Sequence, residues 1–281
     1  MSKAKIFLLA VFSVILFYIL LNIFQNLDIG RDWRITYRPA VLEMVHGRSP
    51  YNIKVFYAAP WSLVPLIPFA LLPYEIGNVC IFLLGLFAFA YTAHKLGATP
   101  ASMVIFLLSA AVVGCLLNGN IEWMPLLGMI LPAPIGLIFA VTKPQVGIGI
   151  AIYWFIRIYR TKGLWAVVKT FSPVILITLL SFWIYGFWIL GFQRTLEQSA
   201  VSAYAYNASV WPHGIFVGLW LLYKSIQKEN PRAAMAASPF LSPYALQYTW
   251  VAVLTGVIHA PLELLAVSVG LWIPVVLRFI P

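Results

Sequence analysis

Residues 6–40 read IFLLAVFSVILFYILLNIFQNLDIGRDWRITYRPA, an apolar run that ends abruptly in charged residues. The polar stretch that begins here, residues 28–60, holds two aspartates, one glutamate and five Lys or Arg, although only 9% of the whole chain is charged. Charged side chains beside a bilayer are costly unless they meet water, lipid phosphate or each other. We therefore interpret residues 28–60 as the head of a candidate active site that a membrane scaffold holds in place.

The composition is typical of a membrane protein. The 281 residues are 62% hydrophobic, with a mean hydropathy of +0.92, whereas soluble domains are about half apolar and a quarter charged. We predict an all-α, polytopic transmembrane bundle that forms a single domain, residues 1–281. The net charge of +10 is attributed to basic cytoplasmic loops and anionic membrane lipids, and no nucleic acid partner is expected. Cys80 and Cys115 lie in apolar runs and are expected to be core residues.

The positions of Lys and Arg predict the orientation in the membrane. Lys3 and Lys5 precede an apolar run that is longer than a signal-peptide core of about 7–15 residues, so we expect an uncleaved first span with a cytoplasmic amino terminus. Residues 27–73 then form a large extracytoplasmic first loop, and the loop of residues 160–169 is cytoplasmic. Further membrane segments are predicted at residues 74–93, 100–117, 146–159, 171–192, 214–223, 233–258 and 262–276. Residues 233–258 are either one kinked span or two pieces.

Prolines are expected to break two further segments. Residues 123–141 contain Leu131-Pro-Ala-Pro134 between two apolar pieces, each too short to cross a bilayer at about 1.5 Å per residue. Half-helices at membrane depth are tolerated where they are buried in protein or line a wet cavity. We expect a hairpin that brings Asn118 and Lys143 to the same side. Residues 61–73 contain three prolines and are shorter than the ~20 residues of a span, so we expect them to dip into the membrane or lie along it.

Asp32 is the strongest candidate for chemistry in the polar stretch. Its neighbours Arg31 and Arg34 favour an ionised carboxylate, which can take a proton from an attacking hydroxyl. The alternatives for Asp32 are a salt bridge within the loop or a helix cap. Asp28 has similar neighbours at greater distance and is the weaker candidate.

Several basic residues could bind phosphate, because guanidinium forks match phosphate oxygens and an ammonium supplies a point charge. These residues are Arg34, Arg38, Arg48 and Lys143. The alternative for each is contact with lipid headgroups at the interface. The histidines show no metal-ligand spacing, so no metal site is expected. Asn207-Ala-Ser209 matches a glycosylation sequon, which is a short and weak pattern.

The order of short motifs resembles the GT-C glycosyltransferases, in particular family 87, the polyprenyl-phosphate-mannose-dependent mannosyltransferases. In the first outer loop the matching motifs are Asp32-x4-Tyr37-x-Pro-Ala, Gly47-Arg-Ser-Pro-Tyr51, Tyr57-Ala-Ala-Pro60 and Leu72-Pro73. Later in the chain they are Asn118-Gly119-Asn120, Lys143-Pro144 and Ser242-Pro243. The chain departs from the family pattern at Asn120, where glutamine is usual, and at Gln247-Tyr248, where histidines often follow the Ser-Pro motif.

The resemblance implies a GT-C-like bundle with broken or re-entrant half-helices. The implied reaction is inverting transfer of a hexose, of the mannose type, from a polyprenyl-phosphate donor to a hydroxyl of a glycan or glycolipid, on the outer face of the cell membrane and without a metal or cofactor. Asp32 would be the base, and the donor phosphate would be bound by Arg38, Arg48 and Lys143. The residues expected to line the substrate are Tyr37, Tyr51, Asn118, Asn120, Gln247 and Tyr248.

Two other functions stay open from the sequence. A transporter or flippase of a lipid-linked saccharide could use the same broken helices and basic residues without cleaving a bond. An inactive member of the family could act as a scaffold. An enzyme requires Asp32 in a cavity beside a lipid groove, whereas a transporter requires a path to both faces of the membrane.

Overall fold

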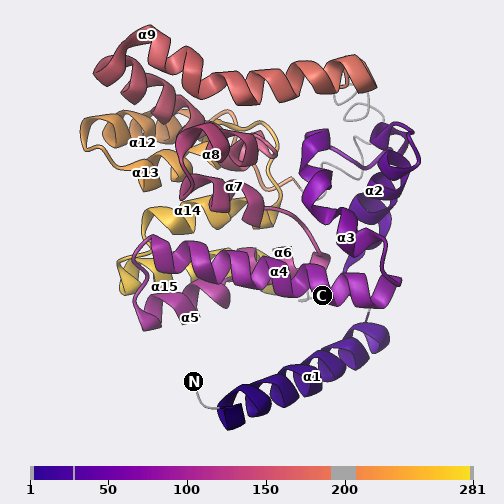
Figure 1. Cartoon of the computed structure of the whole chain (residues 1–281). Helices are drawn as coiled ribbons and strands as arrows, with labels where there is room; N and C mark the ends of the chain where they lie inside the picture. The colour runs from indigo at the N-terminus through magenta and orange to yellow at the C-terminus, as the bar shows by residue number, and fades with distance from the viewer. Residues whose placement is uncertain (1–2, 28, 191–206, 279–281) are drawn as a thin grey trace. The chain divides into compact units, whose positions relative to one another are not determined.

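The computed structural model describes residues 3–27, 29–190 and 207–278, and this part of the chain contains helices and turns but no strand (Figure 1). The predicted all-α class is therefore confirmed. The chain folds as two compact units. Unit 1 comprises Met1–Phe56, Leu63–Gly85 and Leu116–Asn120, and unit 2 comprises Tyr57–Ser62, Leu86–Cys115 and Ile121–Pro281.

Two of the described helices are long and apolar enough to cross a membrane, α4 (Tyr74–Lys95) and α9 (Pro144–Tyr185). The bent pair α5 and α6 makes a third if it counts as one span. Shorter apolar helices in the described ranges cover Val11–Asn26, Pro60–Ala70, Ile215–Gln227 and Pro261–Leu277. These lengths agree with a membrane protein.

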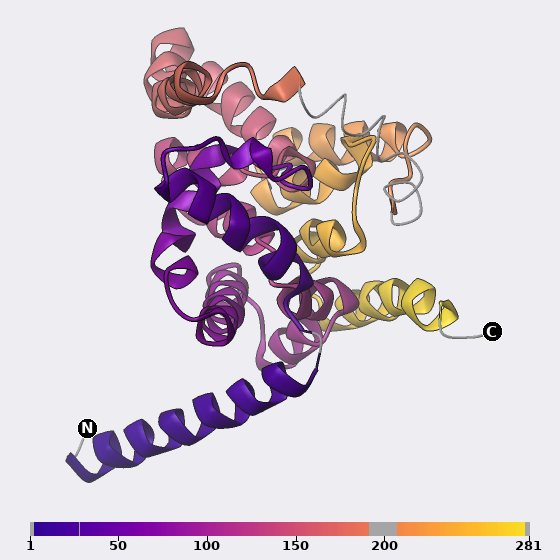
Figure 2. The same cartoon turned by 90° about the vertical axis from the view of Figure 1, so that its right-hand side faces the viewer.

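Unit 1 begins with α1, Lys3–Asn26, and re-enters a helix at Arg31 (Figure 2). This second helix passes through a π-helical segment, η1 (Trp33–Tyr37), directly into α2 (Arg38–Val45). The backbone N–H of Arg38 donates to the carbonyl of Trp33, five residues back. The polar stretch therefore begins as a helix rather than as an open loop.

Pro39 explains the π-helical segment. In a regular α-helix a proline ring clashes with the carbonyl four residues before it, and the wider π turn that precedes Pro39 relieves this clash. In the sequence, Pro39 is compatible with a first helical turn and Gly47 with a helix end, so a short helix from Arg38 to His46 is predicted. Its end is confirmed, because Gly47 has a φ of +72° directly after His46 caps α2. Its start at Arg38 is also as predicted, and the π-helical segment joins α2 directly to the helical turn at Arg31.

The rest of unit 1 consists of short helices, the first half of α4 and residues Leu116–Asn120. These short helices are η2 (Pro50–Asn52), part of η3 (Pro60–Leu66) and α3 (Ile67–Ala70). As expected from its prolines, the segment of residues 61–73 forms no span. In α1, Phe24 meets Phe82 of α4 edge to face, with 5.2 Å between ring centroids.

The predicted membrane segment at residues 100–117 is bent in the structure. Helix α5 covers Pro100–Leu107 and α6 covers Ala110–Asn118, with an angle of 53° between them. Ser109 stabilises the break, because its hydroxyl donates to the Phe106 carbonyl at 2.7 Å and accepts from the Val112 N–H at 3.4 Å. Serine can satisfy backbone groups in this way where a helix restarts.

The predicted loop of residues 160–169 is also corrected. Helix α9 runs from Pro144 to Tyr185, and only Gly163 leaves the helical conformation, with φ +78° and ψ 178°. The region is therefore two helical arms that meet at one glycine. A left-handed φ is costly for other residues, so Gly163 is where the chain can change direction.

Helices α7 (Trp123–Met129) and α8 (Ala133–Ala140) confirm the prediction that residues 123–141 do not form one span. Their backbones approach closely at two glycines. A Cβ built on Gly128 would lie 2.6 Å from the Gly136 carbonyl oxygen, and one on Gly136 would lie 2.5 Å from the Gly128 oxygen. Larger residues at either position would force the two arms of this hairpin apart.

Much of the remainder of unit 2 packs on α9. Residues 233–258 form separate pieces: the end of α13 (Pro231–Ala237), then η4 (Ser238–Leu241), η5 (Gln247–Trp250) and α14 (Val251–Gly256). The Ser238 hydroxyl accepts from the Gly149 N–H at 3.0 Å and so joins η4 to α9. Helices α12 (Ile215–Gln227) and α15 (Pro261–Leu277) complete the unit.

The predicted orientation can be tested by labelling in intact cells. Lys54 and Thr161 are exposed, so each can be replaced with cysteine in a Cys80→Ala background, while Cys115 is buried. Lys54→Cys is expected to react with a membrane-impermeant maleimide and Thr161→Cys only after the membrane is opened, because more Lys and Arg lie on the side of Thr161. The reverse labelling pattern would overturn the orientation and the outward position of Asp32.

Candidate active site

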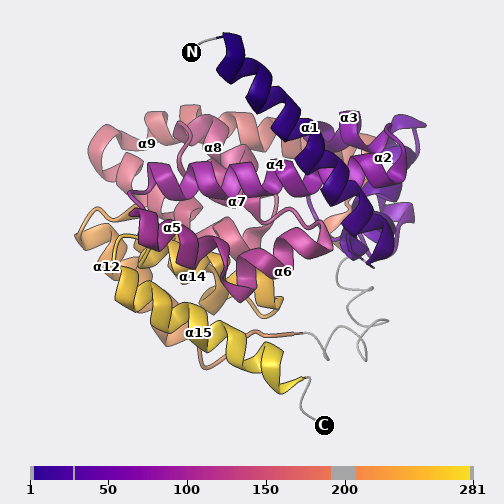
Figure 3. The same ribbon diagram turned by 90° about the horizontal axis from the view of Figure 1, so that it is seen from below.

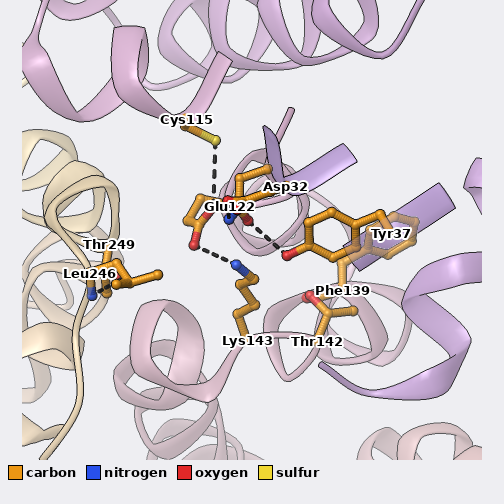
Figure 4. A network of polar contacts seen from close by, with 10 residues as sticks. Asp32, Tyr37, Cys115, Glu122, Phe139, Thr142, Lys143, Leu246 and Thr249 are labelled. Atoms are coloured by element: carbon orange, nitrogen blue, oxygen red, sulfur yellow. Dashed lines mark hydrogen bonds and ion pairs between the residues drawn. The ribbon is translucent and has the colours of Figure 1, made fainter. Parts of the chain in front are cut away.

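The first cluster lies in unit 1 around Asp32. Asp32 is half-buried at the start of the helix, directly before the π turn. Its carboxylate oxygen Oδ2 accepts a hydrogen bond from Asn120 Nδ2 at 2.5 Å. The amide oxygen of Asn120 accepts in turn from the Tyr37 hydroxyl at 2.9 Å. Figure 4 shows this network, in which Asp32 directly precedes η1 and Tyr37 is the last residue of η1. Single π turns in helices occur often at functional sites.

The backbone brings Asn120 to Asp32 although the two residues lie far apart in the sequence. The Gly30 N–H donates to the Leu117 carbonyl at 2.7 Å and ties the end of α6 to the start of the helix. At Gly119, where φ is +68°, a Cβ would lie 2.7 Å from the Cβ of Trp33. Only a glycine allows this approach, so Gly119 is the position that lets the Asn120 side chain reach the carboxylate.

This geometry suits a proton acceptor. Tyr37 and Asn120 are buried, and their hydrogen bond fixes the amide so that its N–H points at Asp32. A carboxylate held in one orientation by a buried amide can accept a proton from a hydroxyl that approaches its exposed side. Asp32, Tyr37 and Asn120 were all predicted as site residues, and the structure brings these three together. Asp28, the weaker candidate, lies outside the described residues.

The second cluster lies in unit 2 and is a buried ion pair. Lys143 Nζ is 2.6 Å from Glu122 Oε1, with the lysine side chain 6% exposed and the glutamate side chain fully buried. Cys115 Sγ donates to the other glutamate oxygen at 3.5 Å, and Lys143 Nζ lies 5.7 Å from the ring centroid of Tyr248. Figure 4 shows Cys115 and Lys143 on either side of Glu122.

Glu122 is the functional candidate that sequence reasoning missed. A buried lysine inside a membrane protein needs a partner, and Lys143 has one in Glu122. The nearest acid on the carboxyl-terminal side of Asn120 is Glu122, separated from it by one residue. The position of Glu122 next to the Asn118-Gly119-Asn120 motif could have predicted its ion pair with Lys143. It was overlooked because Lys143 was assigned to donor phosphate instead of to an acid of the same chain.

Arg48 also has an acidic partner. Its Nε and Nη2 donate to the two carboxylate oxygens of Glu43 at 2.9 and 2.6 Å, and Asn52 Nδ2 donates to Glu43 Oε2 at 2.9 Å. The hydrogen bonds from Arg48 and Asn52 lower the pKa of Glu43 to about 2, and Glu43 raises the pKa of Arg48. The arginine side chain is 56% exposed, so this fork closes the turn after α2 at the surface.

Arg38 differs from Arg48 and Lys143. It is half-buried, its Nη2 donates to the Leu72 carbonyl at a long 3.4 Å, and its Nε is buried without a hydrogen-bond partner in the described part of the chain. No acidic side chain contacts it among the described residues. Of the three predicted phosphate ligands, Arg38 is thus the one whose guanidinium is least used by the protein itself. A buried N–H of this kind is costly when it stays unsatisfied.

The other residues predicted to line the substrate make contacts of their own, outside the hydrogen bonds that join Asp32, Asn120 and Tyr37. Tyr51 packs on Phe56, with 5.3 Å between ring centroids, and Tyr37 meets the same ring at 6.4 Å. Asn118 is half-buried at the end of α6. Gln247 donates to the Leu271 carbonyl at 2.9 Å and so holds η5 to α15. Their roles as lining residues stay predictions.

The sequon at Asn207 has a structural role. The Asn207 side-chain oxygen accepts from the backbone N–H groups of Ser209 and Ala245, both at 3.0 Å, and its amide donates to the Pro243 carbonyl at 3.2 Å. The amide nitrogen that a glycan would occupy is thus hydrogen-bonded to the segment that carries Ser242-Pro243. A glycan at Asn207 would replace one of the two hydrogens of this amide nitrogen.

No family model, curated protein or solved structure matches this chain. Among the described residues there is also no group of three or more His, Cys, Asp or Glu that could hold a metal ion.

Proposed function

We propose that the protein is an integral membrane glycosyltransferase that moves a hexose from a polyprenyl-phosphate donor to a hydroxyl acceptor. The proposal is carried by one observation, the carboxylate of Asp32 oriented by the buried Asn120 and Tyr37. It is further supported by the resemblance of the motifs to the GT-C glycosyltransferases and by apolar helices long enough to cross a membrane. We also propose that the helices form a GT-C-like bundle and that the active site lies on the outer face of the cell membrane.

The proposed reaction is a single displacement. The acceptor hydroxyl attacks the anomeric carbon while Asp32 takes its proton, and the bond from that carbon to the phosphate oxygen breaks. The polyprenyl phosphate leaves with the bonding electron pair, and the configuration at the sugar is inverted. The hydrogen bond from Asn120 keeps the carboxylate oxygen in place, so little reorganisation is needed when the proton moves.

Arg38 is the best supported cation for the donor phosphate. Negative charge grows on the leaving phosphate, and a guanidinium with unused N–H groups stabilises it. Arg38 supplies such a group close in sequence to Asp32. Arg48 and Lys143 already neutralise Glu43 and Glu122, so either would have to exchange an internal ion pair for the phosphate. We therefore rank Arg38 first and keep Arg48 and Lys143 as secondary candidates.

The proposal predicts that Arg38→Gln weakens the use of the donor roughly 10- to 100-fold, because a hydrogen bond to a charged group contributes about 1.5–3 kcal/mol. The measurement is release of polyprenyl phosphate from a panel of polyprenyl-phosphate hexoses, with the purified protein in liposomes. Arg48→Gln is the matched control and is expected to change this rate only a few-fold. Arg38→Lys keeps the charge and should recover part of the lost rate, provided that thermal unfolding shows each variant to be folded.

The same assay separates the competing functions. Movement of the labelled lipid-linked saccharide across the liposome membrane without release of polyprenyl phosphate would favour a transporter. Neither transfer nor movement, with any donor of the panel, would favour an inactive scaffold. If Arg38→Gln and Arg48→Gln lowered the rate of polyprenyl phosphate release equally, Arg38 would not be the main ligand of the donor phosphate.

A further inference from the structure

Three helices of unit 2 carry the same small motif, an aromatic residue followed four positions later by a cation. Residues at this spacing lie on the same face of a helix, and in each case the cation lies over the ring, at 5.5–5.9 Å from its centroid. The pairs are Tyr91 and Lys95 in α4, Tyr153 and Arg157 in α9, and Trp220 and Lys224 in α12.

Residues 228–232, the turn after α12 and the first residues of α13, connect the three motifs. Arg232 at the start of α13 donates to the Leu96 carbonyl, directly after α4, at 3.2 Å. Glu229 in the turn accepts from Arg157 of α9 at 3.0 Å. In Figures 1 and 3, α12, the start of α5 and the bend of α9 lie at the same side of this unit. The three motifs therefore belong to one face, which we call the cationic face.

The cationic face carries a strong excess of positive charge. Its seven cations are exposed or half-buried, and Glu229 is the one acid within the segments 91–99, 153–163 and 220–232. The cations are Lys95, Arg157, Arg160, Lys162, Lys224, Lys228 and Arg232. Within the described residues, Glu229 forms an ion pair with Arg157 alone, and this pair is exposed to solvent. The face therefore attracts anions.

We propose that the cationic face is a binding site for the headgroups of anionic phospholipids. Tyr91 and Trp220 are exposed beside Lys95 and Lys224, and aromatic rings of this kind settle at the level of lipid headgroups. Each cation can hold a phosphodiester while its alkyl stem and the neighbouring ring stay against acyl chains. A soluble phosphate would use the charges but would gain nothing from the exposed rings, so the arrangement favours lipid.

The test compares two variants with the same change in charge. The double variant Lys95→Gln, Lys228→Gln removes two exposed cations from the cationic face, and Lys54→Gln, Lys169→Gln removes two exposed cations elsewhere. Retention of phosphatidylglycerol against phosphatidylcholine is followed by native mass spectrometry of the full chain. At low salt the first variant should bind phosphatidylglycerol about 30-fold more weakly, because each cation near such a surface contributes about 1 kcal/mol. The second variant should bind it like the wild type.

Three results would overturn the proposal. Equal binding of the two lipids by the wild type would show that no anionic lipid is selected. Equal loss in both double variants would show that only the total charge matters. Displacement of phosphatidylglycerol by an equal concentration of glycerol phosphate would show that the face binds a soluble phosphate instead of a lipid. Because no sugar transfer is measured, these outcomes are independent of the proposed enzymatic function.

Discussion

Asp32→Asn is expected to lower the rate of sugar transfer about 10²- to 10⁴-fold, which is the usual loss when a general base is removed. The new side chain has the same size, and its amide oxygen can still accept from Asn120, so the local structure should persist. It cannot take a proton at neutral pH. Donor binding should survive or improve, since a negative charge near the phosphate is removed.

Transfer from polyprenyl-phosphate hexoses and donor binding should be measured in parallel, with thermal unfolding as the test of folding. Tyr37→Phe is a second variant with a smaller expected effect, because it removes only the hydroxyl that orients Asn120. It should cost about 2- to 10-fold in rate, the equivalent of one ordinary hydrogen bond. Asp28→Asn should have a smaller effect than Asp32→Asn. Turnover by Asp32→Asn within a few-fold of the wild type would exclude Asp32 from the reaction.

Glu122→Gln is expected to destabilise the fold by about 3–5 kcal/mol, because it leaves Lys143 charged and without its partner in a buried site. This is a large part of the 5–15 kcal/mol that typically holds a domain together. Thermal unfolding in detergent should show the midpoint lowered by roughly 10 °C. Arg48→Gln, which breaks an exposed pair, is the control and should change the midpoint little.

A double variant separates structure from function at this pair. Glu122→Gln with Lys143→Met removes both charges and should recover most of the lost stability, since apolar or neutral replacements of a buried pair are often tolerated. If Lys143 also binds the donor phosphate, the double variant will be folded but inactive in transfer. A folded and fully active double variant would make the pair purely structural. An unchanged midpoint in Glu122→Gln alone would contradict the buried pair itself.

Local features were predictable because they depend on neighbouring residues. Pro132 and Pro134 remove backbone donors and disfavour helix before them, and α7 and α8 are indeed separate helices. Apolar length likewise predicted α4 and α15 close to their observed bounds. The break at Ser109 was missed, since a single serine within an apolar run does not by itself interrupt a helix. At residues 160–169 an interruption was predicted, but as a loop, whereas α9 only bends there at Gly163.

The partners of the charged residues were decided only by the tertiary structure. Composition alone required that charges in so apolar a chain meet water, phosphate or each other, and it directed attention to Asp32 and Lys143. It could not choose among partners, because Asn120 lies 88 positions from Asp32 and Glu122 lies 21 positions from Lys143. Contacts over such separations depend on how helices pack, here on the close approach that Gly119 allows at Trp33. Periodicity and charge describe each segment separately, whereas a hydrogen bond between two segments requires their backbones to be brought within a few ångströms of each other.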